Sequence, residues 1–149
     1  MDTSLLPPDF KDFLKLLNSR QVEYLLVGGY AVGYYGYVRA TVDMDIWIAS
    51  HPRNAEKMVE VLREFGFAVA GLSAELFLKE NNIIRMGVPP FRLEVLTTIS
   101  GVTFVECFQE RVTATLDGIE VNLISLKHLK ANKKASGRLK DLTDLEYLP

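Results

Sequence analysis

Apolar and polar positions along the chain follow two different periodicities. Helical spacing of apolar residues is found near the N-terminus, between residues 55 and 65, and again from residue 126 onward. Short apolar runs or strict alternation mark predicted strands at residues 22–27, 42–48, 83–88 and 91–97. Asp117-Gly118 separates two further apolar stretches, 112–116 and 119–124, which is a strong hairpin signal. The chain is therefore predicted to combine helices with strands, and residues 67–79 are left open between a short helix and a loop over the site.

The first predicted strand stops at a pair of glycines. Residues 30–37 are compatible with a short helix, so Gly28 and Gly29 would lie at a helix N-terminus. Exposed N–H groups at such an end favour an anion such as phosphate. Taken alone, however, a Gly-Gly pair after a strand is usually only a turn.

Two aspartates lie on the next predicted strand. Asp43 and Asp45 alternate with apolar residues, so they point to the same face, about 6.6 Å apart at ~3.3 Å per residue. Two carboxylates this close repel each other unless a cation lies between them, and Mg²⁺ is the natural occupant. The alternative is that both acids belong to the solvated face of an edge strand.

The joint pattern of strand, Gly-Gly, short helix and Asp-x-Asp resembles the nucleotidyltransferase superfamily that includes DNA polymerase β and the kanamycin nucleotidyltransferases. Arg39-Ala40-Thr41 before the two aspartates is similar to the Arg-x-Thr-x-Asp-Ile-Asp form of small prokaryotic nucleotidyltransferase-like proteins, among them relatives of type IV abortive-infection toxins. This resemblance implies a nucleotidyltransferase fold of the α+β (mixed α/β) class, with a mixed central sheet flanked by helices.

The same superfamily takes a third acid from a neighbouring strand. Glu94 is the candidate because it lies inside the apolar strand 91–97, on the face opposite Leu93 and Val95. The family generally has Asp here, so Glu94 departs from its pattern, and pairing with Arg92 or Arg85 is the alternative interpretation. The resemblance implies that two Mg²⁺ ions, with Mn²⁺ as a substitute, are bound by three residues that are also catalytic: Asp43, Asp45 and Glu94.

Basic residues gather near the C-terminus, although the formal net charge of the chain is −2. The run from Lys133 to Asp141 resembles the Lys-x-x-x-Gly-Arg-x-Lys-Asp stretch of the same small proteins. Without that resemblance, the run would be interpreted as a solvated helix face, and Asp141 and Asp144 as acids of the final helix. The implied nucleotide-binding residues are Gly28, Gly29, Arg39, Thr41, Lys133, Lys134 and Arg138.

The implied reaction is nucleotidyl transfer, in which an acceptor hydroxyl attacks the α-phosphate of a nucleoside triphosphate, expected to be ATP, and pyrophosphate leaves. Glu94 is also a candidate general base for that hydroxyl. The acceptor stays open between a protein hydroxyl, an RNA end and a small molecule. The alternative function is a non-catalytic nucleotide-binding or toxin–antitoxin component on the same fold.

Length and composition indicate the number of domains and the cellular compartment that we expect. A chain of 149 residues with 48% hydrophobic and 24% charged residues is expected to form one domain, residues 1–149, with a basic helical segment at 125–149. No apolar run approaches the ~20 residues of a membrane span, and the start lacks the basic region of a signal peptide. With a single cysteine, Cys107, no internal disulfide forms. We expect a cytoplasmic protein that obtains its acceptor surface from a homodimer or a small helical partner.

Overall fold

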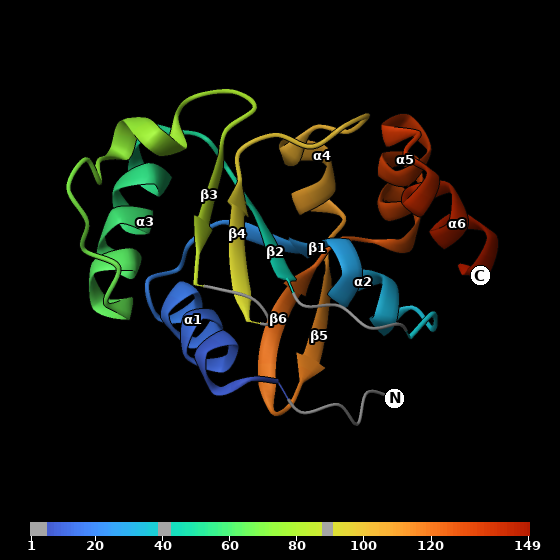
Figure 1. Ribbon diagram of the computed structural model, residues 1–149, viewed down its shortest axis with the longest axis horizontal. Coiled ribbons are helices and arrows are strands. Elements are labelled where there is room, and N and C mark those ends of the chain that lie inside the picture. The colour runs from blue at the N-terminus through green and yellow to red at the C-terminus, as the bar shows by residue number, and fades with distance from the viewer. Residues whose placement is uncertain (1–5, 39–42, 88–90) are drawn as a thin grey trace.

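The computed structural model describes residues 6–38, 43–87 and 91–149 (Figure 1). Its helices are α1 (Pro8–Ser19), α2 (Gly28–Tyr34), α3 (Pro52–Phe65), the 3-10 helix η1 (Ala74–Phe77), α4 (Phe104–Gln109), α5 (Leu126–Ser136) and α6 (Leu139–Tyr147). Its strands are β1 (Tyr24–Val27), β2 (Asp43–Ile48), β3 (Ile83–Met86), β4 (Arg92–Leu96), β5 (Val112–Leu116) and β6 (Ile119–Leu123).

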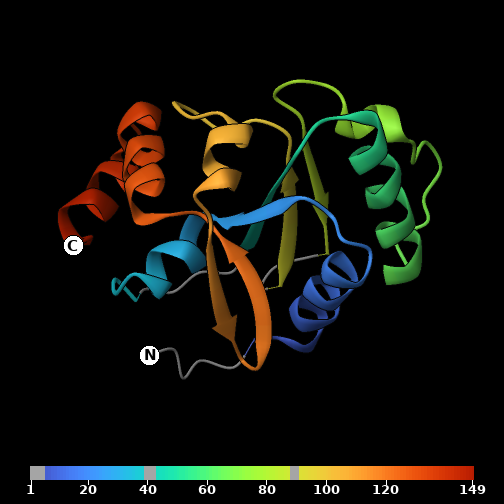
Figure 2. The same cartoon turned by 180° about the vertical axis from the view of Figure 1, so that it is seen from behind.

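The strands form one six-stranded sheet in the order β3-β4-β2-β1-β6-β5. The pairs β2–β4 and β1–β6 are parallel, whereas β1–β2, β3–β4 and β5–β6 are antiparallel. Helices α1 and α3 lie toward one end of this sheet, and α5 and α6 lie at the other end, as both views show (Figures 1 and 2). The predicted mixed central sheet flanked by helices is therefore confirmed.

The local predictions agree with the structure in most places. The hairpin β5–β6 turns at Asp117 and Gly118, whose φ angles of 48° and 77° are those of the tight turns that suit paired strands. Residues 74–77 form η1, which packs against α3 rather than over the strand β2. Among the described residues, no helix is long and apolar enough to cross a membrane.

Strand β2 shows how the sequence pattern positions the site. Met44, Ile46 and Ile48 are fully buried on one face, which anchors the strand in the core. On the other face, Trp47 is also buried, and its ring lies 5.1 Å from that of Phe104 in α4. Only the first half of this second face, which carries the two aspartates, stays partly open.

A single buried amide ties the ends of β1 and β2 to α3. The Asn54 side chain is 1% exposed; its Oδ1 accepts a hydrogen bond from the backbone N–H of Glu23 at 2.9 Å. Its Nδ2 donates to the backbone oxygens of Glu23 at 3.1 Å and Ala49 at 2.8 Å. Since buried backbone groups need partners, this residue closes the hydrogen-bonding of both strand ends.

We predict that Asn54→Ala lowers the free energy of unfolding by roughly 2–4 kcal/mol, because it leaves buried backbone groups without partners. Urea unfolding followed by the fluorescence of the buried Trp47 measures the change. Glu56→Ala, at an exposed position of the same helix, is the control and is expected to change little. Equal stability of the two variants would show that the amide is not needed.

Candidate active site

The register of the sheet brings the three predicted acids to one face. Asp45 lies opposite Glu94, and Asp43 lies opposite Arg92, along the parallel pair β2–β4. On the other side of β2, Asp45 lies opposite Val27, the last residue of β1. Because directly paired residues of neighbouring strands project to the same side, the carboxylates share one face with the end of β1.

Asp45 is the most enclosed of these acids. Burial raises its pKa to about 7, and the neighbouring charges of Glu94 and Asp43, together with a hydrogen bond to Glu94, act in the same direction. Its Oδ1 is buried and has no hydrogen-bond partner among the described residues. A buried carboxylate in this situation is stable only with a proton or a cation beside it.

Gly28 makes room for that carboxylate. Its φ is +70°, a conformation that L-residues rarely adopt, and a Cβ atom added there would lie 2.1 Å from Asp45 Oδ2. The residue is the first of the seven in α2, as predicted for a glycine at a helix start. Its second role, which is to let Asp45 lie against the backbone, could be recognised only once β1 and β2 were paired.

Two arginines neutralise the acids from the β3 side. Arg92 Nε and Nη2 each lie 3.3 Å from the carboxylate of Asp43, and Arg85 Nε lies 2.8 Å from Glu94 Oε2. Arg92 Nε also lies 3.8 Å from Glu94 Oε2. The alternative interpretation of Glu94, pairing with these arginines, is thus present in the structure, and it leaves the oxygen donors on the same face as Asp45.

The donor set suits a hard divalent cation such as Mg²⁺. Three carboxylates, among them that of Asp45 with its unpartnered Oδ1, offer the oxygen ligands that Mg²⁺ prefers. With the arginine pairs formed, the described residues include no group of three or more His, Cys, Asp or Glu side chains that could hold a metal ion. Binding of a cation by Asp43 and Glu94 would compete with their ion pairs to Arg92 and Arg85.

A pocket of about 200 Å³ opens beside Asp45. One wall is formed by the end of β1 and by Gly28 and Gly29, and the opposite wall is formed by α5 and α6. Thr98, Ile99 and Ser100, which follow β4, complete it. The C-terminal residues that line it are Asn132, Lys133, Ser136, Arg138, Lys140 and Asp141.

The predicted nucleotide-binding residues are thus only partly brought together. Gly28, Gly29, Lys133 and Arg138 line the pocket, whereas Lys134 is exposed and does not line it. Arg39 and Thr41 lie outside the described residues. Sequence reasoning missed Asn132 and the loop after β4 as lining residues, because neither carries a charge pattern.

Lys133 is held in a buried ion pair rather than presented to solvent. Its Nζ lies 2.9 Å from Asp141 Oδ1 and 3.1 Å from Asp144 Oδ2, and all three residues are at most 5% exposed. Burial tends to raise the pKa of Asp141, but hydrogen bonds from Lys133, Ser136 and Arg138 lower it to about 2. The basic run is therefore partly a structural clamp between α5 and α6.

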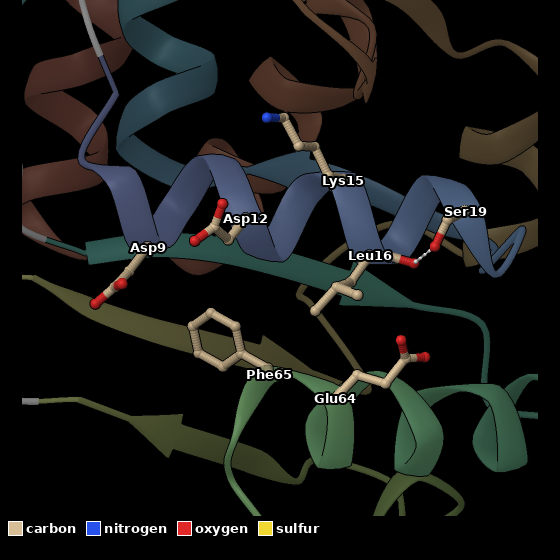
Figure 3. Close-up of a pocket in the computed structure, with 7 residues that line it drawn as sticks. All are labelled: Asp9, Asp12, Lys15, Leu16, Ser19, Glu64 and Phe65. Atoms are coloured by element: carbon tan, nitrogen blue, oxygen red, sulfur yellow. Dashed lines mark hydrogen bonds between the residues drawn. The ribbon is translucent and has the colours of Figure 1, made fainter.

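A larger hollow of about 550 Å³ lies between α1 and α3 (Figure 3). Its lining residues are Asp9, Asp12, Lys15, Leu16, Ser19, Glu64 and Phe65, all from these two helices. None of them is among the predicted site residues. The predicted site residues Gly28, Gly29, Asp45, Lys133 and Arg138 line the smaller pocket instead.

The likeness of this chain to known proteins is one of structure. No family model matches the chain, and no curated protein matches it in sequence. Among solved structures, a presumed nucleotidyltransferase from Thermotoga maritima superposes with a TM-score of 0.66 at 14% identity, over 97% of this chain and 94% of the other.

The structures of two antibiotic-related proteins are also similar. The antibiotic-resistance factor ANT(2'')-Ia gives a TM-score of 0.58 at 11% identity, covering 93% of this chain and 79% of that protein. The lincosamide antibiotic adenylyltransferase LnuA, solved with lincomycin bound, gives 0.56 at 12% identity, covering 97% and 96%. At these identities the likeness defines the fold, which is nucleotidyltransferase-like.

We predict that Lys133→Ala lowers the free energy of unfolding by about 3–5 kcal/mol, because it leaves two buried carboxylates unpaired. Lys134→Ala removes the same side chain from the adjacent, exposed position and should cost less than about 0.5 kcal/mol. Urea unfolding of both variants measures the difference. Similar losses in the two variants would contradict a buried clamp.

We also predict that Asp45→Asn raises the free energy of unfolding by roughly 1–3 kcal/mol at pH 8 in the presence of a chelator, because it removes a buried charge beside Glu94. Thermal and urea unfolding measure it, with Asp9→Asn at an exposed position of α1 as the control. A clear loss of stability would instead identify Asp45 as a structural residue.

Proposed function

We propose that this chain is a metal-dependent nucleotidyltransferase that moves a nucleoside monophosphate from a nucleoside triphosphate to an acceptor hydroxyl and releases pyrophosphate. One observation carries the proposal: Asp45 keeps a buried oxygen without a partner among the described residues, directly beside Glu94, and lines a pocket together with Gly28 and Gly29. A purely structural role would leave the cost of this arrangement without compensation.

The acids are assigned to metal binding and proton transfer. Asp43, Asp45 and Glu94 would hold two Mg²⁺ ions, or Mn²⁺, which when bound neutralise phosphate charge and lower the pKa of an attacking hydroxyl. Glu94, on β4 beside β2, accepts the proton of that hydroxyl. Asp45 lies opposite Glu94 and two residues after Asp43 on β2, so it would contribute oxygen ligands together with either of these acids.

The pocket is assigned to the triphosphate. Backbone N–H groups at Gly28 and Gly29 bind phosphate oxygens from one wall, and Arg138 and Lys140 bind them from the other. Lys133 supports this wall from within through its ion pairs with α6. These groups hold the α-phosphate against the acids, which is the main requirement of phosphoryl transfer.

ATP is the donor that we propose first, since LnuA, with the same fold, is described as an adenylyltransferase. The lincomycin bound to LnuA makes a small hydroxylated molecule the first acceptor to test. A protein hydroxyl and an RNA end are the other acceptors. A second copy of the chain or a small helical protein would add the acceptor surface.

The second candidate function is a non-catalytic nucleotide-binding protein, such as a toxin–antitoxin component. The arginine pairs favour it, because they satisfy Asp43 and Glu94 without a metal ion. The two functions differ in turnover. A binding protein takes up the nucleotide but releases no pyrophosphate.

The test is incubation with each α-labelled nucleoside triphosphate and Mg²⁺, in the presence of pooled small molecules, RNA or protein acceptors. We expect pyrophosphate release and a labelled acceptor, both lost in Asp45→Asn and Glu94→Gln while the fold is retained. Nucleotide binding without pyrophosphate release under every condition would favour the second function.

For nucleotide binding, we predict that Arg138→Ala weakens the affinity for Mg²⁺-ATP by about 1.5–3 kcal/mol, the scale of a hydrogen bond to a charged group. Lys134→Ala is the matched comparison, since Lys134 was expected to bind nucleotide but lies outside the pocket lining. Isothermal titration at two salt concentrations measures both. Equal losses of affinity in the two variants would mean that Lys134 also binds the nucleotide. Unchanged affinity in both would mean that the basic run does not bind it.

A further inference from the structure

Two arginines on the acid face lie outside the pocket assigned to the nucleotide. Arg85 of β3 and Arg92 of β4 have side chains that are 55% and 33% exposed, whereas the carboxylates they contact, on Glu94 and Asp43, are 15% and 25% exposed. The guanidinium groups are therefore the outer members of these ion pairs. They can turn toward solvent without disturbing the core.

The strand order separates these arginines from the pocket. Along β3-β4-β2-β1, the acids of β4 and β2 lie between Arg85 at one side and Gly28, after β1, at the other. Neither arginine lines the pocket formed with α5 and α6. The pocket is lined by the end of β1 and by Leu96, at the C-terminal end of β4. A nucleotide held there would leave Arg92, at the N-terminal end of β4, and Arg85 on β3 for a second reactant.

We propose that Arg85 and Arg92 form a phosphate-binding pair that is covered by Asp43 and Glu94 until divalent cations occupy these carboxylates, and that its ligand is a phosphate group on the acceptor. This inference rests on the proposed function and narrows its acceptor to an anionic one. Two guanidinium groups on adjacent strands match phosphate because each presents a planar set of donors to its oxygens.

The switch follows from the charges involved. Partly exposed ion pairs contribute little stability, so releasing the guanidinium groups from the carboxylates would cost a divalent cation little of its binding free energy. The released arginines keep their positive charge, because arginine is not deprotonated in proteins. They then lie beside the metal site without carboxylate partners, and their positive charge attracts an anion.

The first experiment measures the competition directly, with Mn²⁺ alone and no phosphate present. Free Mn²⁺ is followed by electron paramagnetic resonance for wild type, Arg85→Gln, Arg92→Gln and the double variant. We expect the double variant to bind Mn²⁺ roughly three- to tenfold more tightly, because the competing cations are gone. Unchanged or weaker Mn²⁺ affinity would overturn the proposal.

The second experiment titrates inorganic phosphate into the Mn²⁺-loaded protein. We expect the double variant to bind phosphate at least about tenfold more weakly than wild type, since two charge-assisted contacts are lost. Arg53→Gln, at an exposed position of α3, is the matched control and should behave as wild type. Equal phosphate affinity in wild type and the double variant would mean that phosphate binds the metal alone, and would overturn the proposal.

The third measurement separates the two sources of phosphate. With the pocket saturated by a non-hydrolysable ATP analogue, we expect phosphate to bind still in an arginine-dependent manner. Exclusion of phosphate by the analogue, with weaker analogue binding in the double variant, would assign the arginines to the donor and overturn the acceptor assignment.

Variants that retain the fluorescence of the buried Trp47 are folded. The double variant Arg85→Lys with Arg92→Lys keeps the positive charges but loses the planar set of donors, so it should give intermediate phosphate affinity.

Failure of this inference is distinguishable from failure of the proposed function. If wild type binds Mn²⁺ and releases pyrophosphate, but the arginine variants have the same Mn²⁺ and phosphate affinities as wild type, the inference alone is overturned. Wild type that binds no Mn²⁺ overturns both.

Discussion

The parallel pairing of β2 with β4 is the constraint on which the site depends. It places Asp45 directly opposite Glu94, so two carboxylates share one small region of the sheet. Burial and the repulsion between the carboxylates raise the pKa of Asp45 to about 7, so its charged form needs a cation beside it. The arginines of β3 and β4 supply positive charge on one side, and Gly28 supplies space on the other.

The C-terminal helices add a second electrostatic unit with a different purpose. Lys133, Asp141 and Asp144 join α5 to α6 through buried ion pairs, which keep the exposed Arg138 and Lys140 at the rim of the pocket. Removing one partner of such a cluster is costly, because the others stay buried and charged. The basic run near the C-terminus therefore has two parts: the buried Lys133 joins the two helices, and the exposed Arg138 and Lys140 line the pocket.

The part of the site that sequence reasoning could predict is the part that depends on local periodicity. Alternation along β2 places Asp43 and Asp45 on one face because strand side chains repeat every two residues. The same parity identified Glu94, and Asp117-Gly118 identified the hairpin. The burial of Lys133 could not be predicted, since its partners lie beyond the break at Gly137, in the next helix.

The sequence by itself determined most of the strands and helices, which acids share a face and where the β5–β6 hairpin turns, because these follow from side-chain spacing and backbone preference within a few residues. Only the tertiary structure decided that β4 lies beside β2, that Gly28 lies against Asp45, and that Arg85 and Arg92 cover the acids. Strand order and cross-strand contacts arise from packing between segments far apart in the chain, and local spacing carries no information about them.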